Sequence, residues 1–153
     1  MRGLSFTADG ELFVVDITLV QKVARKMAVT LIHTAPDEVI GIANMKGSVI
    51  TLLSLYVLLG RKERRGQERF AQVVNAVIFK SPSGSEDQMG LVIDEPGGLI
   101  NINEEAICPP SLATGAEESF CISGIADIGN KLYRIICIDS IIKKYKQSSE
   151  INK

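Results

Sequence analysis

The chain has 153 residues, 17 Lys and Arg against 18 Asp and Glu, and a formal net charge of −1. This length suits one domain, or two small subdomains that share a core. The near-neutral charge argues against nucleic acid or an anionic membrane surface as a partner. The uncharged stretch after Lys46 is too short to span a bilayer, and no apolar leader follows Met1, so we expect no direct membrane insertion.

Three cysteines, Cys108, Cys121 and Cys137, are odd in number and lack the spacing of a metal site. Cys121 and Cys137 stand among apolar residues and are predicted to be small core side chains. A reduced, cytoplasmic protein fits this usage best.

The first residues predict a hairpin followed by a short helix. Residues 4–7 and 12–15 are strand-like, and the Asp9-Gly10 pair between them suits a turn. Asp16 stands where a helix N-cap is expected. The apolar face of that helix would consist of three residues at helical spacing, Ile17, Val20 and Val23. The core is therefore the default assignment for these residues. Residues 23–32 are predicted to be extended again.

The apolar centre of the sequence is residues 36–60, PDEVIGIANMKGSVITLLSLYVLLG. It predicts a helical turn at Pro36, then an extended run over 40–45, a strand over 49–53 and a short helix over 54–59. A Gly after a Lys between two apolar extended runs, here Lys46-Gly47, is typical of a hairpin. Met45 and Lys46 at an exposed tip suit a contact surface, and a plain turn explains them about equally well.

Beyond residue 60 the sequence alternates strands with polar connections. The strands we expect are 72–80, 88–93, 99–102, 120–128 and 131–138. The connections we expect are the charged loop 61–69, turns at 81–87 and 94–98, a surface segment over 103–118, and a primed turn at Gly129-Asn130. Asp139 is predicted to cap a final helix whose inward residues are Ile141, Ile142 and Tyr145. Nine or ten short strands and few helices predict a mainly β, barrel-type fold.

Few residues offer catalytic or metal-binding chemistry. His33 is the only histidine, and no G-x-S-x-G elbow accompanies it, which argues against His-based metal sites and a Ser-His-Asp triad. Lys46 precedes Gly47, the reverse of the order in a phosphate-binding loop. We therefore expect no enzyme activity, cofactor or metal. The alternative is a small β-barrel that binds a ligand, or a weak hydrolase, that uses His33 or Cys108.

Five motifs in order resemble those of the CheW-like family of chemotaxis coupling proteins, over residues 4 to about 146. They are FVVDITLVQKV (13–23), TAPDEVIG (34–41), GIANMKG (41–47), GLVID (90–94) and the segment from Ser123-Gly124 to Ile142. GIANMKG is similar to the family's G-V-x-N-L-R-G. Together the motifs make the resemblance specific, although each is weak alone.

The resemblance implies one CheW-like domain over residues 1–153, made of two five-stranded β-barrel subdomains that share an apolar core, with short helices outside. It implies a non-catalytic adaptor that couples chemotaxis receptors to the histidine kinase CheA. Such an adaptor binds the regulatory domain of the kinase and the cytoplasmic tip of the receptors. Carried over by motif, the partner-binding positions are Val20, Lys22, Gly41, Asn44, Met45, Lys46 and Gly47.

The chain departs from the family at several motif positions. Lys46 stands where the family usually has Arg, and lysine cannot reproduce the two-pronged contact of a guanidinium. Ser54 and Tyr56 replace an Asp and an Arg; if these two form an ion pair in relatives, losing both ends together can be nearly neutral. Val14 or Val15 replaces a usual Gly. The chain thus resembles a divergent member.

Overall fold

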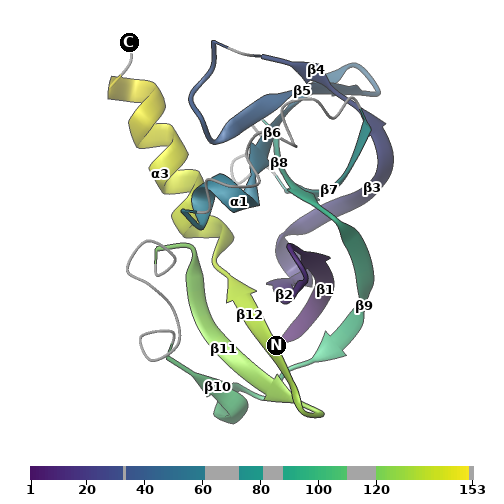
Figure 1. Cartoon of the computed structure of the whole chain (residues 1–153), viewed down its shortest axis with the longest axis vertical. Helices are drawn as coiled ribbons and strands as arrows, with labels where there is room; N and C mark the ends of the chain where they lie inside the picture. The colour runs from purple at the N-terminus through teal and green to yellow at the C-terminus, as the bar shows by residue number, and fades with distance from the viewer. Residues whose placement is uncertain (33, 61–72, 81–87, 110–119, 152–153) are drawn as a thin grey trace.

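The computed structural model describes residues 1–32, 34–60, 73–80, 88–109 and 120–151, the last six of these by their backbone alone. Within these residues, twelve strands form two six-stranded sheets, drawn in Figure 1 as the lower and upper halves of the molecule. His33, the charged loop over 61–69, the turn over 81–87 and most of the connection over 103–118 lie outside the described residues.

The first sheet combines the two ends of the chain. Its strands, in spatial order, are β10 (Ile107–Cys108), β11 (Ile122–Ile128), β12 (Lys131–Ile136), β2 (Glu11–Asp16), β1 (Arg2–Ala8) and β9 (Glu95–Asn101). β2 and β12 pair in parallel and every other pair is antiparallel. The N-terminal hairpin therefore completes a sheet built otherwise from the C-terminal part of the chain.

The second sheet uses the middle of the chain. Its strands, in spatial order, are β3 (Val20–Ala28), β7 (Val73–Phe79), β8 (Gln88–Ile93), β6 (Ser48–Ser54), β5 (Val39–Met45) and β4 (Thr30–Leu31). β6 and β8 pair in parallel, and the other pairs are antiparallel. The two sheets thus share one pattern of pairing.

In each sheet, the two strands at the ends of the spatial order are consecutive in the chain, so the sheet curls towards closure. β3 is followed by β4, and β9 is followed by β10, at opposite ends of their strand orders. Each sheet contains five longer strands and one strand of two residues. The predicted mainly β architecture of two barrel-like subdomains is therefore confirmed, with one strand of each subdomain split in two.

Three short helices lie between strands, η1 (Ile17–Leu19), α1 (Leu55–Leu58) and η2 (Glu104–Ala106), and the longer α3 (Ile138–Ile151) follows the last strand. Asp16 does cap η1, since its Oδ1 accepts a hydrogen bond from Thr18 N at 3.0 Å. The predicted helix is wrong beyond Leu19, because Val20 begins strand β3. Asp139 lies in the first turn of α3, one residue inside it, and not at the cap.

The turn predicted over 94–98 is wrong, because strand β9 begins at Glu95. β9 pairs on one side with β1, and a bulge sets Gly97 and Gly98 against Ser5. The Ser5 hydroxyl donates to Gly98 O (3.0 Å) and accepts from Gly98 N (3.1 Å), so it replaces the ladder bonds that the bulge interrupts. Pro96 is tolerated because β9 is the last strand in the order of its sheet, so one of its edges needs no ladder hydrogen bonds.

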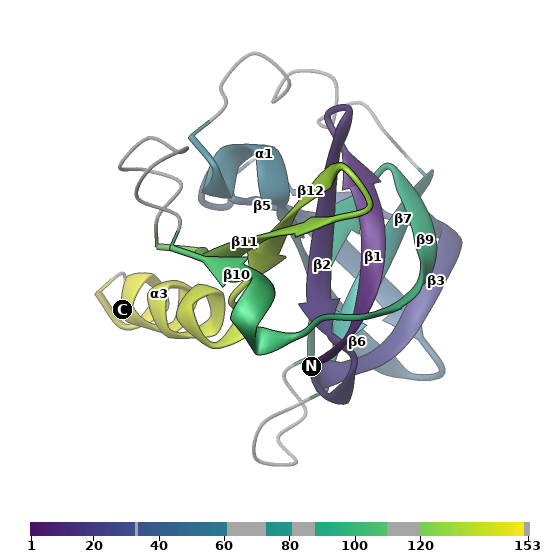
Figure 2. The same ribbon diagram turned by 90° about the horizontal axis from the view of Figure 1, so that it is seen from below.

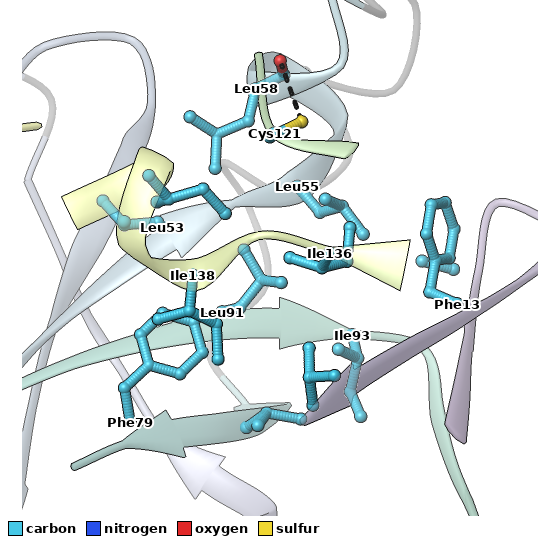
Figure 3. Packing of buried hydrophobic residues seen from close by; sticks show 14 of the residues in the cluster. Phe13, Leu53, Leu55, Leu58, Phe79, Leu91, Ile93, Cys121, Ile136 and Ile138 are labelled. Carbon is cyan, nitrogen blue, oxygen red and sulfur yellow. Dashed lines mark hydrogen bonds between the residues drawn. The ribbon is translucent and has the colours of Figure 1, made fainter. Parts of the chain in front are cut away.

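A shared apolar core lies between the two sheets, and α1 and α3 close it on one side (Figures 1 and 2). Figure 3 shows Phe13 of the first sheet, Leu53 and Leu91 of the second, and Ile138 of α3 converging there. The side chain of Phe13 also stacks on that of Phe6, with ring centroids 5.6 Å apart. Each sheet adds a smaller cluster of its own. The predicted shared core is confirmed.

The two sheets make visible an internal repeat that is hard to recognise in the sequence alone. GIANM (41–45) forms most of β5, and GIADI (124–128) forms most of β11. Each is followed by a two-residue turn with positive φ, a strand, and then a helix, α1 or α3. The β5–β6 and β11–β12 hairpins therefore occupy equivalent places in the two sheets.

Candidate functional site

The β5–β6 hairpin carries most of the positions that resemblance assigns to partner binding. Its turn has φ of 52° at Lys46 and 84° at Gly47, the pair of positive angles that defines a type I′ hairpin turn. The Oδ1 atom of Asn44 accepts a hydrogen bond from Gly47 N at 3.1 Å. Asn44 therefore holds the turn that presents Lys46, and the predicted tight turn is confirmed.

The side chains of this hairpin differ in how much they offer to a partner. Asn44, Lys46 and Gly47 are exposed, whereas Met45 is half-buried against the internal cluster of the second sheet. Val49, which pairs with Asn44, is 55% exposed, although its sequence pattern predicts only that it lies in a strand. Alternation from the buried Ile50 was the signal that could have placed Val49 outside. The exposed tip is therefore Asn44, Lys46, Gly47, Ser48 and Val49.

Gly41 has a structural role that is separate from this surface. It is buried, it pairs with Leu31 of β4, and a Cβ atom at this position would collide with the carbonyl oxygen of Thr30. Only glycine lets β4 approach β5 so closely. Gly41 thus shapes the edge of the sheet on which the hairpin stands.

Val20 and Lys22 lie on β3, at the far end of the strand order from β4. Val20 is 8% exposed, packs in the shared core and pairs with Phe79, so the default assignment to the core is confirmed. Lys22 is exposed and pairs with Ile78. Of these two positions, only Lys22 offers a side chain to a partner in this conformation. That either residue binds one stays a prediction.

The two departures at Ser54 and Tyr56 are accommodated by hydrogen bonds. Ser54 caps α1, its Oγ accepting from Val57 N at 3.3 Å. The buried Tyr56 hydroxyl donates to Asp94 Oδ1 at 2.6 Å, and Asp9 N donates to Asp94 Oδ2 at 2.8 Å. Tyr56 therefore links α1 to the junction of β8 and β9 and to the β1–β2 turn.

The described residues offer little support for the alternative of a ligand-binding or hydrolase site at His33 or Cys108. His33 lies outside the described residues, and Cys108 is an exposed thiol on β10. Across residues 1–32, 34–60, 73–80, 88–109 and 120–151, no group of three or more His, Cys, Asp and Glu could hold a metal ion. Over the same described ranges, no helix is both long enough and apolar enough to cross a membrane.

Comparison with known proteins bears on the whole chain. The family model of the CheW-like domain matches residues 2–146. A chemotaxis protein CheW of Rhizobium meliloti (strain 1021) is 24% identical over 139 residues, which cover 90% of this chain and 84% of that one. The chemotaxis protein CheW of Treponema pallidum (strain Nichols) is 25% identical over 151 residues, covering 98% and 84%.

A solved structure has the same fold. The crystal structure of the scaffolding protein TtCheW from Thermoanaerobacter tengcongensis superposes with a TM-score of 0.72. The match covers 89% of this chain and 88% of that one, at 25% sequence identity. Low identity with nearly complete coverage agrees with a divergent sequence on a retained fold.

Proposed function

Because the chain belongs to the CheW-like domain family, we propose that it is a non-catalytic adaptor that couples chemotaxis receptors to the histidine kinase CheA. The observation that carries this proposal is the family match over residues 2–146, together with the fold of a solved scaffolding protein. The proposed partners are the regulatory domain of the kinase and the cytoplasmic tip of the receptors. The proposed location is the cytoplasm.

The exposed tip of the β5–β6 hairpin is the proposed receptor-facing contact. Its turn is fixed by the Asn44 side chain, so Lys46 and Val49 are presented by a backbone that loses little freedom on binding. A valine beside a lysine offers apolar area together with one charge, a combination that suits a modest, reversible interface.

The test is a calorimetric titration of the purified protein with each partner, the receptor tip and the kinase regulatory domain from the same organism. Lys46→Glu is the test variant. Lys131→Glu is its matched control, because Lys131 directly follows the turn of the equivalent β11–β12 hairpin, is exposed, and undergoes the same change of charge. Both variants are expected to keep the wild-type unfolding midpoint, since both side chains are exposed.

We expect saturable binding of both partners by the wild-type protein. Lys46→Glu should weaken receptor-tip binding at least tenfold, while Lys131→Glu should change it less than twofold. Wild-type affinity in Lys46→Glu would remove the hairpin tip from the receptor interface. A folded wild-type protein that binds neither partner would contradict the adaptor function itself.

A further inference from the structure

Strand β3 contains two β-bulges where it pairs with β7. Val20 pairs with Phe79 and Lys22 with Ile78, so Gln21 is an extra residue. The second bulge lies between Ala24 and Met27, where Lys26 has φ of 53°. Bulges re-aim side chains and are retained features of a fold rather than accidents of it.

The bulges change which side chains of β3 reach solvent. A regular strand with one buried face exposes every second residue. In β3 exposure runs in pairs, first Gln21 and Lys22, then Arg25 and Lys26, while Val23 and Met27 are half-buried. Three cations therefore stand exposed within five residues.

The second bulge is held in place by a chain of hydrogen bonds. Lys26 N donates to Asn75 Oδ1 at 2.9 Å, and Asn75 Nδ2 donates to Asp94 O at 2.7 Å. The carboxylate of Asp94 is in turn bound by the Tyr56 hydroxyl. A left-handed backbone conformation is unfavourable for lysine by itself. These hydrogen bonds therefore stabilise the bulged form of the strand.

The three cations form no ion pair with the residues that the structure describes. The adjacent strand β7, VVNAVIF, carries no charge. An ion pair between described residues joins Arg134 to Glu11, and both of these residues lie in the other sheet. The charges of these three side chains are therefore not paired with any carboxylate that the structure describes.

We propose that this cationic strip, Lys22, Arg25 and Lys26 of β3, docks an acidic helical segment of a partner protein. The inference rests on the proposed function, and it requires that the receptor tip present an acidic helical face to this strip. Four residues of chain span at most about 14 Å, so Lys22 and Lys26 on the bulged strand are no farther apart than this. Carboxylates seven residues apart on one face of a helix are about 10.5 Å apart, within reach of such long side chains.

Two other anionic partners fit the strip less well. β3 carries no aromatic side chain on which nucleic-acid bases could stack. Three cations are also fewer than the four to eight, approximately, that mark a lipid-binding basic cluster. An acidic protein surface needs neither feature.

The experiment compares two variants of equal net charge, −3, which each remove two exposed cations. The test variant is Lys22→Gln/Arg25→Gln, and the control is Lys131→Gln/Lys143→Gln, whose lysines lie on β12 and α3. Each is titrated with the purified receptor tip at 50 mM and 300 mM NaCl, roughly a factor of 2.4 in screening length. Circular dichroism verifies the fold.

We expect the test variant to bind the tip about tenfold more weakly at 50 mM NaCl and to lose most of the salt dependence of the wild type. The control should stay within about twofold. A tip whose exposed carboxylates are changed to amides should bind the wild-type protein as weakly as the normal tip binds the test variant.

Unchanged affinity and salt dependence in the test variant would overturn the inference and leave the adaptor function standing. The same holds if the test variant loses binding to phosphatidylserine vesicles or duplex DNA while its binding to the tip is unchanged. A wild-type protein that binds neither the tip nor the kinase domain would refute both proposals.

Discussion

The hydroxyl of Tyr56 connects three separate segments of the chain through Asp94. Tyr56→Phe removes this hydroxyl and keeps the buried ring, so the change isolates the 2.6 Å bond to Asp94 Oδ1 and a weaker one from Asp9 N at 3.3 Å. A hydrogen bond to a charged group contributes about 1.5–3 kcal/mol to stability. We therefore expect the free energy of unfolding to fall by about 2 kcal/mol.

Urea unfolding followed by circular dichroism measures this change. With an m-value of about 2 kcal/mol/M, the unfolding midpoint should fall by about 1 M with no change in slope. Tyr133→Phe is the control, because Tyr133 is a half-buried tyrosine of β12 whose hydroxyl makes no hydrogen bond in the described structure. Its stability should stay within about 0.5 kcal/mol of wild type.

The hydrogen exchange of one amide extends the test to the bulge in β3. Because Asp94 also holds Asn75, and Asn75 accepts from Lys26 N, exchange at Lys26 should accelerate in Tyr56→Phe. A loss of less than 0.5 kcal/mol in Tyr56→Phe would refute the reasoning. So would an equal loss in Tyr133→Phe.

Three further substitutions test the packing around the candidate site. Gly41→Ala should cost about 3 kcal/mol and expose the β4 amides to exchange, because its methyl group meets the Thr30 carbonyl; an unchanged urea midpoint would contradict this. Val20→Asp buries a carboxylate, so circular dichroism should show a largely unfolded chain. Lys22→Asp, at an exposed position, should stay native. A native-like Val20→Asp would contradict the placement of Val20 in the core. Ser54→Ala should lose about 1 kcal/mol of thermal stability with its cap, and Ser54→Thr should keep most of it; equal losses would argue against capping.

The β5–β6 hairpin was predictable because its signals are local. A Lys-Gly pair between apolar runs specifies a turn with two positive φ angles, and the structure has them. Strand β3 was harder for a physical reason. Its two bulges bury or half-bury Val20, Val23, Ala24 and Met27, which is the i, i+3, i+4, i+7 spacing of a helix. A bulged strand and a short helix therefore give the same pattern over one or two turns.

Long-range contacts were beyond the sequence for another reason. The segment after Asp94 carries Pro and two Gly, which favour a turn locally, and the Ser5 hydroxyl that makes a bulged strand there is about 90 residues away. The same applies to Tyr56, whose acceptor Asp94 is 38 residues distant. That the exposed tip and the cationic strip bind partners stays a prediction, since both follow from surface chemistry alone.

The parallel pairing of β2 with β12 also determines when the first sheet can be completed during synthesis of the chain. Phe13 meets Arg134, about 120 residues later in the chain. At roughly 5–20 residues per second of translation, the ribosome needs about 6–24 s to add that length. During this interval the second sheet, residues 20–93, can form, while the N-terminal hairpin exposes an unpaired edge and is marginally stable alone. Nascent chains are therefore most exposed to misassociation before β12 emerges.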